Sequence, residues 1–234
     1  MAKNKGIILR SIDFKETSKI IYLITESGIR SVIVRGAKKL TGRTLFLTNS
    51  FTEIEYQAKE ADLPVLTDGD LLFDFSGIRN DYLKYFFAEN ISAYLYLASP
   101  EVDFPLLYRL FQASLKLIDN YQDAEIISFA FEIKFLFFLG LKPELTNCVC
   151  CGNLEIAAID VDKGGFICHL HKGSQTFDSE VALAIKELYY SKLELLKDLS
   201  LSSNVRQEIR QFISSYYQRH ANFINKVTTN IRKD

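Results

Sequence analysis

The sequence predicts an α+β protein, with a small β-barrel followed by a helical domain that carries a metal-binding insertion. Three observations lead to this prediction. Short runs rich in Ile and Val fill the first 67 residues, as in strands that are half buried. From about residue 79 the apolar residues recur at helical spacing. All four cysteines fall within residues 148–168.

Five strands are expected in the first part of the chain. They cover residues 6–13, 19–27, 29–36, 51–58 and 63–67. The turn at residues 26–28 predicts a hairpin, and Pro64 suits a sheet edge. In the fourth strand Ile54 and Tyr56 would share one face, opposite Glu53 and Glu55. Five short strands in about 65 residues favour a small OB-type barrel, which we place at residues 1–78.

Helices are expected in the rest of the chain, and we assign residues 79–234 to a second domain. They cover residues 82–97, 104–120, 125–139, 179–190 and 204–223. Asp103 is a candidate N-cap for the second helix, and Gly140 with Pro143 would end the third. The metal-binding insertion would occupy about residues 146–173.

The cysteine cluster has the spacing of a zinc ribbon. Cys148 and Cys151 form one pair, followed by Gly152, and Cys168 and His171 form a second pair with the same spacing. Two intervening residues let a tight turn direct both ligands at one tetrahedral ion. The segment between the pairs reads as a β-hairpin that would bring the turns together. We therefore predict one Zn²⁺.

Three cysteines and one histidine would fill the coordination sphere, so this zinc would be structural. Cys150 and His169 would point away from the ion, and we interpret them as bystanders. The alternative is a hydrophobic hairpin with reduced core thiols, which explains neither turn.

Charge is strongly segregated although the formal net charge is only −1. Residues 1–60 carry 11 basic and 6 acidic groups, and residues 61–130 carry 4 basic and 11 acidic groups. No acid lies between Glu26 and Glu53. The basic residues in that window are candidate DNA ligands, on or beside a loop between strands: Arg30, Arg35, Lys38, Lys39 and Arg43. A solvated loop without a partner is the alternative.

Two further features have both a functional and a structural interpretation. Tyr22 and Tyr56 could stack on bases, but core packing is the commoner role for tyrosine in a small barrel. A second acid-free stretch near the C-terminus is a further candidate DNA surface or the solvated face of a helix. Its basic residues are Arg210, Arg219, Lys226, Arg232 and Lys233.

We expect a cytoplasmic protein. The N-terminus lacks the apolar run of a secretory signal, and the most apolar stretch, residues 126–141, is interrupted by Glu132 and Lys134. Clustered cysteines suit a metal site in a reducing compartment better than a disulfide framework. We find no phosphate-binding loop, no serine elbow and no His-Glu-x2-His pair, so we do not expect an enzyme.

Several stretches, taken in order, resemble the bacterial RecO family of DNA-repair proteins over about residues 5–172. These are residues 11–17, 20–28, 36–39 (Gly-Ala-Lys-Lys), 51–56, 63–72, 131–139, 140–145 (Gly-Leu-Lys-Pro-Glu-Leu), the CVCCG turn and GGFIC. Single motifs are weak, but their order and spacing together are fairly specific. Many zinc-binding members have Cys where this chain has His171, which also completes a tetrahedral site.

The resemblance implies an OB-fold, then a helical domain with a zinc-binding insertion. It also implies binding of single- and double-stranded DNA, annealing of strands coated by single-strand-binding protein (SSB), and action with RecR to help load RecA. Such a protein would be nucleoid-associated, with no membrane partner. The alternative is a protein-interaction scaffold without DNA binding, in which the acidic residues after residue 60 contact a basic partner.

Overall fold

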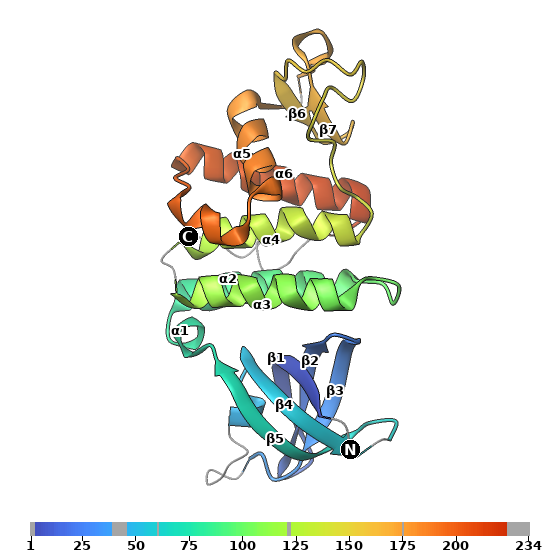
Figure 1. Cartoon of the computed structure of the whole chain (residues 1–234), viewed down its shortest axis with the longest axis vertical. Helices are drawn as coiled ribbons and strands as arrows, with labels where there is room; N and C mark the ends of the chain where they lie inside the picture. Colours follow the sequence, from blue (N-terminus) through green and yellow to red (C-terminus); the bar gives the residue numbers. More distant parts are fainter. Residues whose placement is uncertain (1–2, 39–45, 60, 121–122, 175, 224–234) are drawn as a thin grey trace. The chain divides into compact units, whose positions relative to one another are not determined.

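The computed structural model describes residues 3–38, 46–59, 61–120, 123–174 and 176–223 (Figure 1). Two compact units divide the chain. Unit 1 contains residues 1–96 and 100–122, and unit 2 contains residues 97–99 and 123–234. The domain boundary expected at residue 78 lies inside unit 1, where the chain changes from strands to helices. The division into two domains at that residue stays a prediction. No helix among the described residues is long and apolar enough to cross a membrane.

Unit 1 begins with a closed five-stranded barrel of strand order β1-β2-β3-β5-β4, which confirms the OB-like prediction. Its strands are β1 (Asn4–Phe14), β2 (Ser18–Thr25), β3 (Gly28–Val34), β4 (Thr52–Lys59) and β5 (Val65–Asp74). The predicted hairpin joins β2 to β3, with Thr25 opposite Gly28. Gly28 has φ +106, a conformation that favours glycine.

Alternation along the strands builds the barrel core. Ile8, Ile21, Leu23, Val32 and Ile54 are buried inside it, and Tyr56 joins them with 5% of its surface exposed. Every second residue of a strand shares a face, so this set follows from the apolar pattern of the sequence.

β5 is longer than the predicted segment 63–67. Asp68, Gly69 and Asp70 are poor strand formers, which is why the sequence pattern ended early. Pairing with β4 carries the strand on to Asp74. A Cβ at Gly69 would lie 2.9 Å from a methyl carbon of Leu47 in the barrel core, so a larger residue there would require Leu47 to shift. Tertiary pairing therefore overrides the local preference.

Unit 1 continues with α1 (Ser76–Arg79), α2 (Tyr82–Tyr94), the 3-10 turn η2 (Leu95–Leu97) and α3 (Phe104–Asn120). Asp81 caps α2 by accepting hydrogen bonds from the backbone of Leu83 and Lys84. The predicted cap of α3 is also present, since Asp103 accepts from the Leu106 N–H at 2.9 Å.

Unit 2 consists of three long helices and a small sheet. The helices are α4 (Ala124–Phe138), α5 (Ser179–Tyr190) and α6 (Ser203–Ala221), each within two residues of its predicted bounds. α4 contacts both α5 and α6. Gly140, with φ +68, follows α4 where the sequence predicts its end.

The sheet lies between α4 and α5 in the sequence. Its strands are β6 (Ala158–Asp160), β7 (Gly165–Ile167) and β8 (Thr176–Asp178), in the order β7-β6-β8. β6 and β7 pair as the predicted hairpin, and Ile159 lies opposite Phe166. The third strand, β8, was not predicted. It directly precedes α5 in the sequence and joins the sheet through its pairing with β6, which no local pattern reveals.

Candidate metal centre and nucleic-acid interface

The four predicted metal ligands converge. The ligand atoms of Cys148, Cys151, Cys168 and His171 all lie within 4.8 Å of one another. Three of the distances between ligand atoms are 3.3 Å from Cys168 Sγ to His171 Nδ1, 3.7 Å from Cys148 Sγ to His171 Nδ1 and 3.8 Å from Cys151 Sγ to Cys168 Sγ. A tetrahedral ion with bonds of about 2.3 Å to sulfur needs sulfur atoms about 3.8 Å apart. The donor set and its spacing therefore fit zinc.

Two backbone turns aim these side chains. In the first, the Gly152 N–H donates to the Cys148 carbonyl at 2.8 Å, and Gly152 has φ +73. In the second, the His171 N–H donates to the Cys168 carbonyl at 3.1 Å. Pairing of β6 with β7 brings the second turn to the first. Local turns and one hairpin are thus sufficient to build the site.

The electrostatics of the first turn favour a thiolate, the form that binds metals. Desolvation acts to raise the pKa of Cys148, but backbone hydrogen bonds, the strongest from Cys168, outweigh it and lower that pKa to about 6. Cys148 and Cys168 are each 1% exposed, so both sulfur atoms are shielded from water.

The two predicted bystanders lie outside the cluster. Cys150 and His169 are both exposed, and neither contributes to the group of ligands. Lys163 lies beside the site, and its Nζ donates to the His171 carbonyl at 2.8 Å.

The predicted DNA-binding residues do not form one cluster. Arg30 lies near the start of β3, and Arg35 and Lys38 follow its end. Arg35 lies five residue steps from Arg30 along the extended chain, about 16 Å at 3.3 Å per residue. Lys39 and Arg43 lie outside the described residues.

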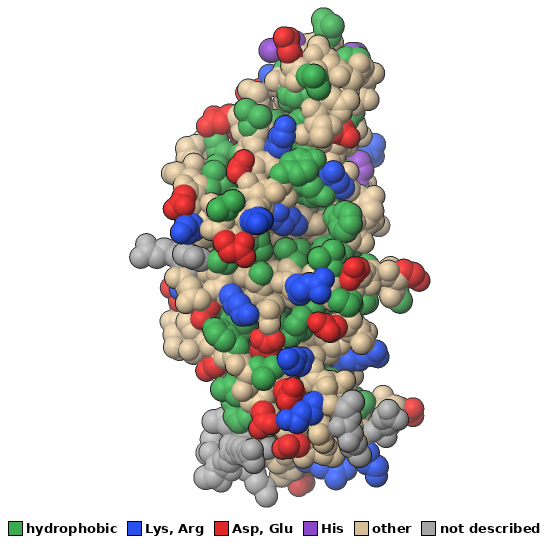
Figure 2. Space-filling model, in the orientation of Figure 1, with side chains coloured by type: hydrophobic (Ala, Val, Ile, Leu, Met, Phe, Trp, Pro, Cys, Tyr) green, Lys and Arg blue, Asp and Glu red, His purple; other side chains and the backbone are tan. Residues whose placement is uncertain are grey.

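The described part of the basic loop is partly neutralised. Lys38 Nζ lies 3.1 Å from a carboxylate oxygen of Asp13 and donates to the Lys15 carbonyl at 3.0 Å. Arg35 is exposed and has no ion pair among the described residues. Figure 2 shows basic and acidic side chains interleaved on the visible face of the barrel. Among the residues that the structure describes, the basic side chains on this face therefore form no continuous stripe.

The two tyrosines differ in role. Tyr56 belongs to the barrel core. Tyr22 is half-buried on the outside, and the guanidinium of Arg10 lies 4.5 Å from the centre of its ring. The centre of the Tyr96 ring lies 5.7 Å from the same guanidinium. Tyr22 thus already has a cationic stacking partner within the chain.

The C-terminal basic residues that the structure describes are engaged in ion pairs. Arg210 pairs with Glu125, and Arg219 Nε lies 2.9 Å from Asp162. Lys226, Arg232 and Lys233 lie outside the described residues. This leaves the described face of α6 with little free positive charge.

Sequence reasoning missed two groups of polar residues. Buried Glu53 accepts hydrogen bonds from Tyr108 at 2.9 Å and from Gln112 at 2.6 Å, which ties β4 to α3. Lys5 and Lys59 belong to the second group, at one end of the barrel, where β1 pairs with β4. Only that pairing brings them together, so no local pattern could have revealed them.

This combination defines a class of protein: an OB-type barrel followed by a helical region whose insertion carries a cluster of three cysteines and one histidine that is compatible with a metal site. Two family models match the chain. Recombination protein O N terminal covers residues 1–75, and Recombination protein O C terminal covers residues 79–226. The chain is 30% identical to DNA repair protein RecO of Bacillus subtilis and 31% identical to that of Bacillus pumilus, over 94% of this chain and 90% of each relative.

The chain belongs to the RecO family of DNA-repair proteins. The resemblance found in the sequence is therefore confirmed, together with the α+β fold class.

Proposed function

We propose that this chain is a non-enzymatic mediator of recombinational repair that binds single- and double-stranded DNA. In this proposal it anneals complementary strands coated by SSB and acts with RecR to help load RecA. Family membership is the observation that carries the proposal. An OB-type barrel, with cations on the β3 strand and the loop that follows it, gives it a physical basis.

The work of annealing is electrostatic. Two strands repel through their phosphates, and lysine and arginine side chains lower that repulsion by displacing condensed counterions. Arg35 and Lys38 lie on the segment after β3, which Lys39 and Arg43 continue in the sequence. No proton transfer or bond cleavage is required of the protein.

Zinc would serve this function by holding the insertion together. Cys148, Cys151, Cys168 and His171 would hold the ion and would leave no position for an activated water. When bound, the ion supplies a cross-link between two turns of a sheet too small to be stable alone. This role agrees with a protein that is not an enzyme.

DNA binding can be tested by anisotropy of a labelled single-stranded oligonucleotide over a salt titration. Four or five phosphate contacts would give a slope of log K against log salt of about −3. The double variant Lys38→Ala/Lys39→Ala should weaken binding to all sequences alike and flatten the slope. Lys186→Ala/Lys192→Ala removes the same charge from exposed positions of unit 2 and should change little.

Annealing is the second test. Complementary strands coated with SSB should pair faster with the wild-type protein than without it, and more slowly with the loop variant. Absence of oligonucleotide binding at low salt would contradict the proposal and favour the protein-interaction scaffold. The ion pairs of Lys38, Arg210 and Arg219 favour this alternative, because each of these cations already has a carboxylate partner within the chain.

A further inference from the structure

The four predicted metal ligands differ in their exposure to solvent. Cys148 and Cys168 are each 1% exposed. His171 is half-buried, whereas Cys151 is exposed. Oxidation of a cysteine depends on its thiolate character and on its access to solvent. Cys151 is therefore the ligand that an oxidant in solution reaches first.

A thiol partner for an oxidised Cys151 lies within reach. The Sγ of Cys151 is 3.8 Å from the Sγ of Cys168, which belongs to the other turn. A disulfide bond measures about 2.05 Å, so the two sulfur atoms need to approach each other by about 1.8 Å. Rotation of the two side chains about their Cα–Cβ bonds is a movement of this size. The pair can thus be joined without rebuilding either turn.

Cys148 is a poorer partner because its sulfur atom is held in place by the backbone. The N–H groups of Cys150, Cys151 and Cys168 all hydrogen-bond to it. A bond between Cys148 and Cys151 would pull the sulfur away from these donors, whereas a bond between Cys151 and Cys168 leaves them in position. The hydrogen bonds of the first turn therefore favour Cys168 as the partner.

Cys150 shows that exposure alone does not make a disulfide. It is exposed like Cys151 and directly precedes it, but it lies outside the cluster of ligands. Cysteines whose side chains point apart cannot be joined without movement of the backbone. Cys150 therefore offers a matched control, a thiol that is open to solvent but has no partner in place.

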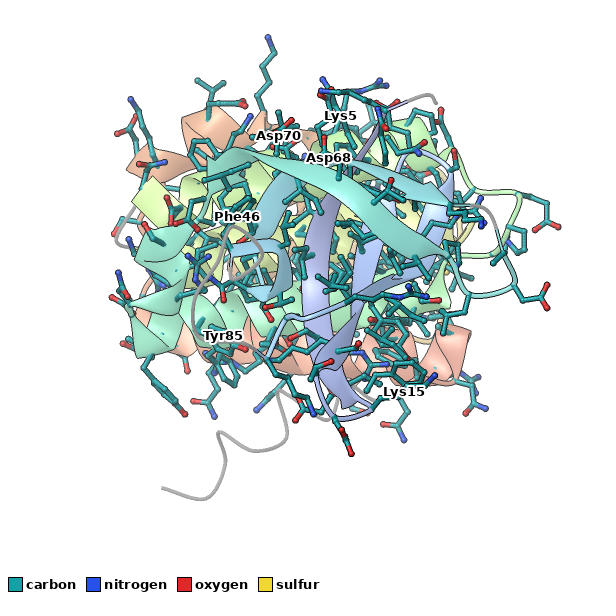
Figure 3. All side chains as sticks on the ribbon, turned by 90° about the horizontal axis from the view of Figure 1, so that it is seen from below. Lys5, Lys15, Phe46, Asp68, Asp70 and Tyr85 are labelled. Atoms are coloured by element: carbon teal, nitrogen blue, oxygen red, sulfur yellow. The ribbon has the colours of Figure 1, made fainter. Side chains whose placement is uncertain are left out.

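The rest of the chain offers an oxidant no other thiol. All four cysteines lie within residues 148–168, and the single methionine is residue 1. The sequence of the barrel, whose side chains are drawn in Figure 3, contains no cysteine. Thiol oxidation of this protein is thus confined to the metal cluster and Cys150.

We propose that Cys151 and Cys168 form a peroxide-sensitive pair, which releases the metal ion when it is oxidised to a disulfide. The inference rests on the predicted zinc and is independent of the proposed DNA binding. Disulfides in reducing compartments are usually transient and either catalytic or redox-sensing. Oxidation would exchange a site with four ligands for a single covalent link between the two turns.

The reaction removes two electrons from the pair. The thiolate of Cys151 attacks one oxygen of hydrogen peroxide, breaks the O–O bond, forms a sulfenic acid and releases hydroxide. The thiolate of Cys168 then attacks the Cys151 sulfur, forms the S–S bond and expels a second hydroxide. Two protons from solvent convert the hydroxides to water. Cys148 and His171 remain, which is two ligands too few for a closed zinc site.

Zinc release under hydrogen peroxide measures this reaction in the full chain. A metallochromic dye follows the released ion, and mass spectrometry of peptides from the unreduced protein identifies the linked cysteines. The wild-type chain should release about one zinc and should contain a disulfide between Cys151 and Cys168. Dithiothreitol with added zinc should restore the metal, because thiol–disulfide exchange reduces the bond.

Two variants separate exposure from proximity. Cys151→His keeps four ligands of the kinds that zinc accepts but removes the exposed thiol. It should lose zinc at least about tenfold more slowly than the wild type, because peroxide must then reach a buried sulfur atom. Cys150→Ser removes the other exposed thiol and should release zinc at the wild-type rate.

Several results would overturn the inference. One is a disulfide that joins Cys151 to Cys148 or Cys150, and another is a sulfinic acid at Cys151 beside a reduced Cys168. Unchanged release in Cys151→His, or its loss in Cys150→Ser, would also contradict it. If Cys151→His binds no zinc, the disulfide found in the wild type decides alone. A wild-type chain that keeps its zinc under peroxide contradicts the inference alone, and a chain purified without zinc contradicts the predicted metal as well.

Discussion

The metal-binding turns and the basic residues of the barrel were both read from short stretches of sequence, yet they behave differently in the structure. Cys148 and Cys151 converge with the second pair as predicted. Arg30 and Lys38 separate to opposite ends of β3. A two-residue spacing inside a turn fixes the geometry, because the turn has few conformations. Charged residues that are close in the sequence need not be close in space when they lie on a strand, because each residue of an extended strand adds about 3.3 Å to their separation.

The largest expected effect comes from breaking the metal cluster. Cys168→Ser should abolish zinc binding and unfold the sheet β6–β8, because zinc contributes about 10–16 kcal/mol in small zinc-dependent folds. Zinc per chain, measured by atomic emission, should fall from one to none. Cys150→Ser is the matched control and should keep one zinc. Retention of zinc by Cys168→Ser would show that the turns do not form the site.

A buried network built from distant residues should give the next largest effect. Glu53→Ala leaves the hydroxyl of Tyr108 and the amide of Gln112 without their acceptor, which costs about 2–4 kcal/mol in the free energy of unfolding. Glu53→Gln keeps a carbonyl acceptor and should cost about 1 kcal/mol. Urea denaturation measures both. Equal losses for the two variants would mean that the charge of Glu53, rather than its acceptor atoms, is what matters.

Separation of the cations along β3 can be tested by a double-mutant cycle in DNA binding. Arg30→Ala and Lys38→Ala should each weaken binding by about 1 kcal/mol or less, and the double variant should show the sum. Independent contacts far apart give this result. A coupling energy above about 0.5 kcal/mol would indicate one shared site and would remove the contrast with the metal cluster.

The smallest effect concerns the ion pairs between α4 and α6. Arg206 contacts Asp123 at 2.6 Å and Glu125 at 3.0 Å. Desolvation acts to raise the pKa of Asp123, but the hydrogen bonds from Arg206 and from the Ile126 N–H outweigh it and lower that pKa. The carboxylate therefore stabilises the fold above its unfolded pKa of about 3.9, and this contribution is lost as the pH falls through the lower folded value.

Arg206→Gln should accordingly lower the free energy of unfolding by only about 0.5–1 kcal/mol at pH 7, because these groups are partly exposed. The difference from the wild type should shrink below about pH 4. Chemical denaturation at pH 3, 5 and 7 measures it. A difference that grows at low pH would contradict the assigned direction.

Local signals in the sequence predicted most of the fold. Apolar alternation gave the five barrel strands, and caps such as Asp103 and breakers such as Gly140 gave helix ends within two residues, except that α2 ends at Tyr94, three residues before its predicted end. The spacing of the cysteines and the histidine predicted which four side chains converge. Each of these features depends on residues fewer than about ten positions apart or on a hairpin. A pattern within one stretch of sequence is therefore enough to predict it.

Features that depend on distant pairing escaped prediction. The length of β5 follows from its register with β4, and the burial of Glu53 follows from the placement of α3. Lys5 and Lys59 come to the same end of the barrel because β1 pairs with β4, with Asn4 opposite Tyr56. The ion pairs of α6 likewise join residues more than fifty positions apart. Contacts of this kind produce no periodic pattern in the sequence of either segment, so the sequence alone does not reveal them.

Closure of the barrel rests on a short seam between β3 and β5. Ile33 pairs with Val65 as the one registered pair of these two parallel strands in the described residues, and the Ile33 N–H donates to the Pro64 carbonyl at 2.8 Å. All other neighbouring strands share at least four registered pairs. Local opening starts where backbone hydrogen bonds are fewest. The Ile33 amide should thus exchange with deuterium faster than the buried amides of β2, and the seam is the place where the barrel wall would part first.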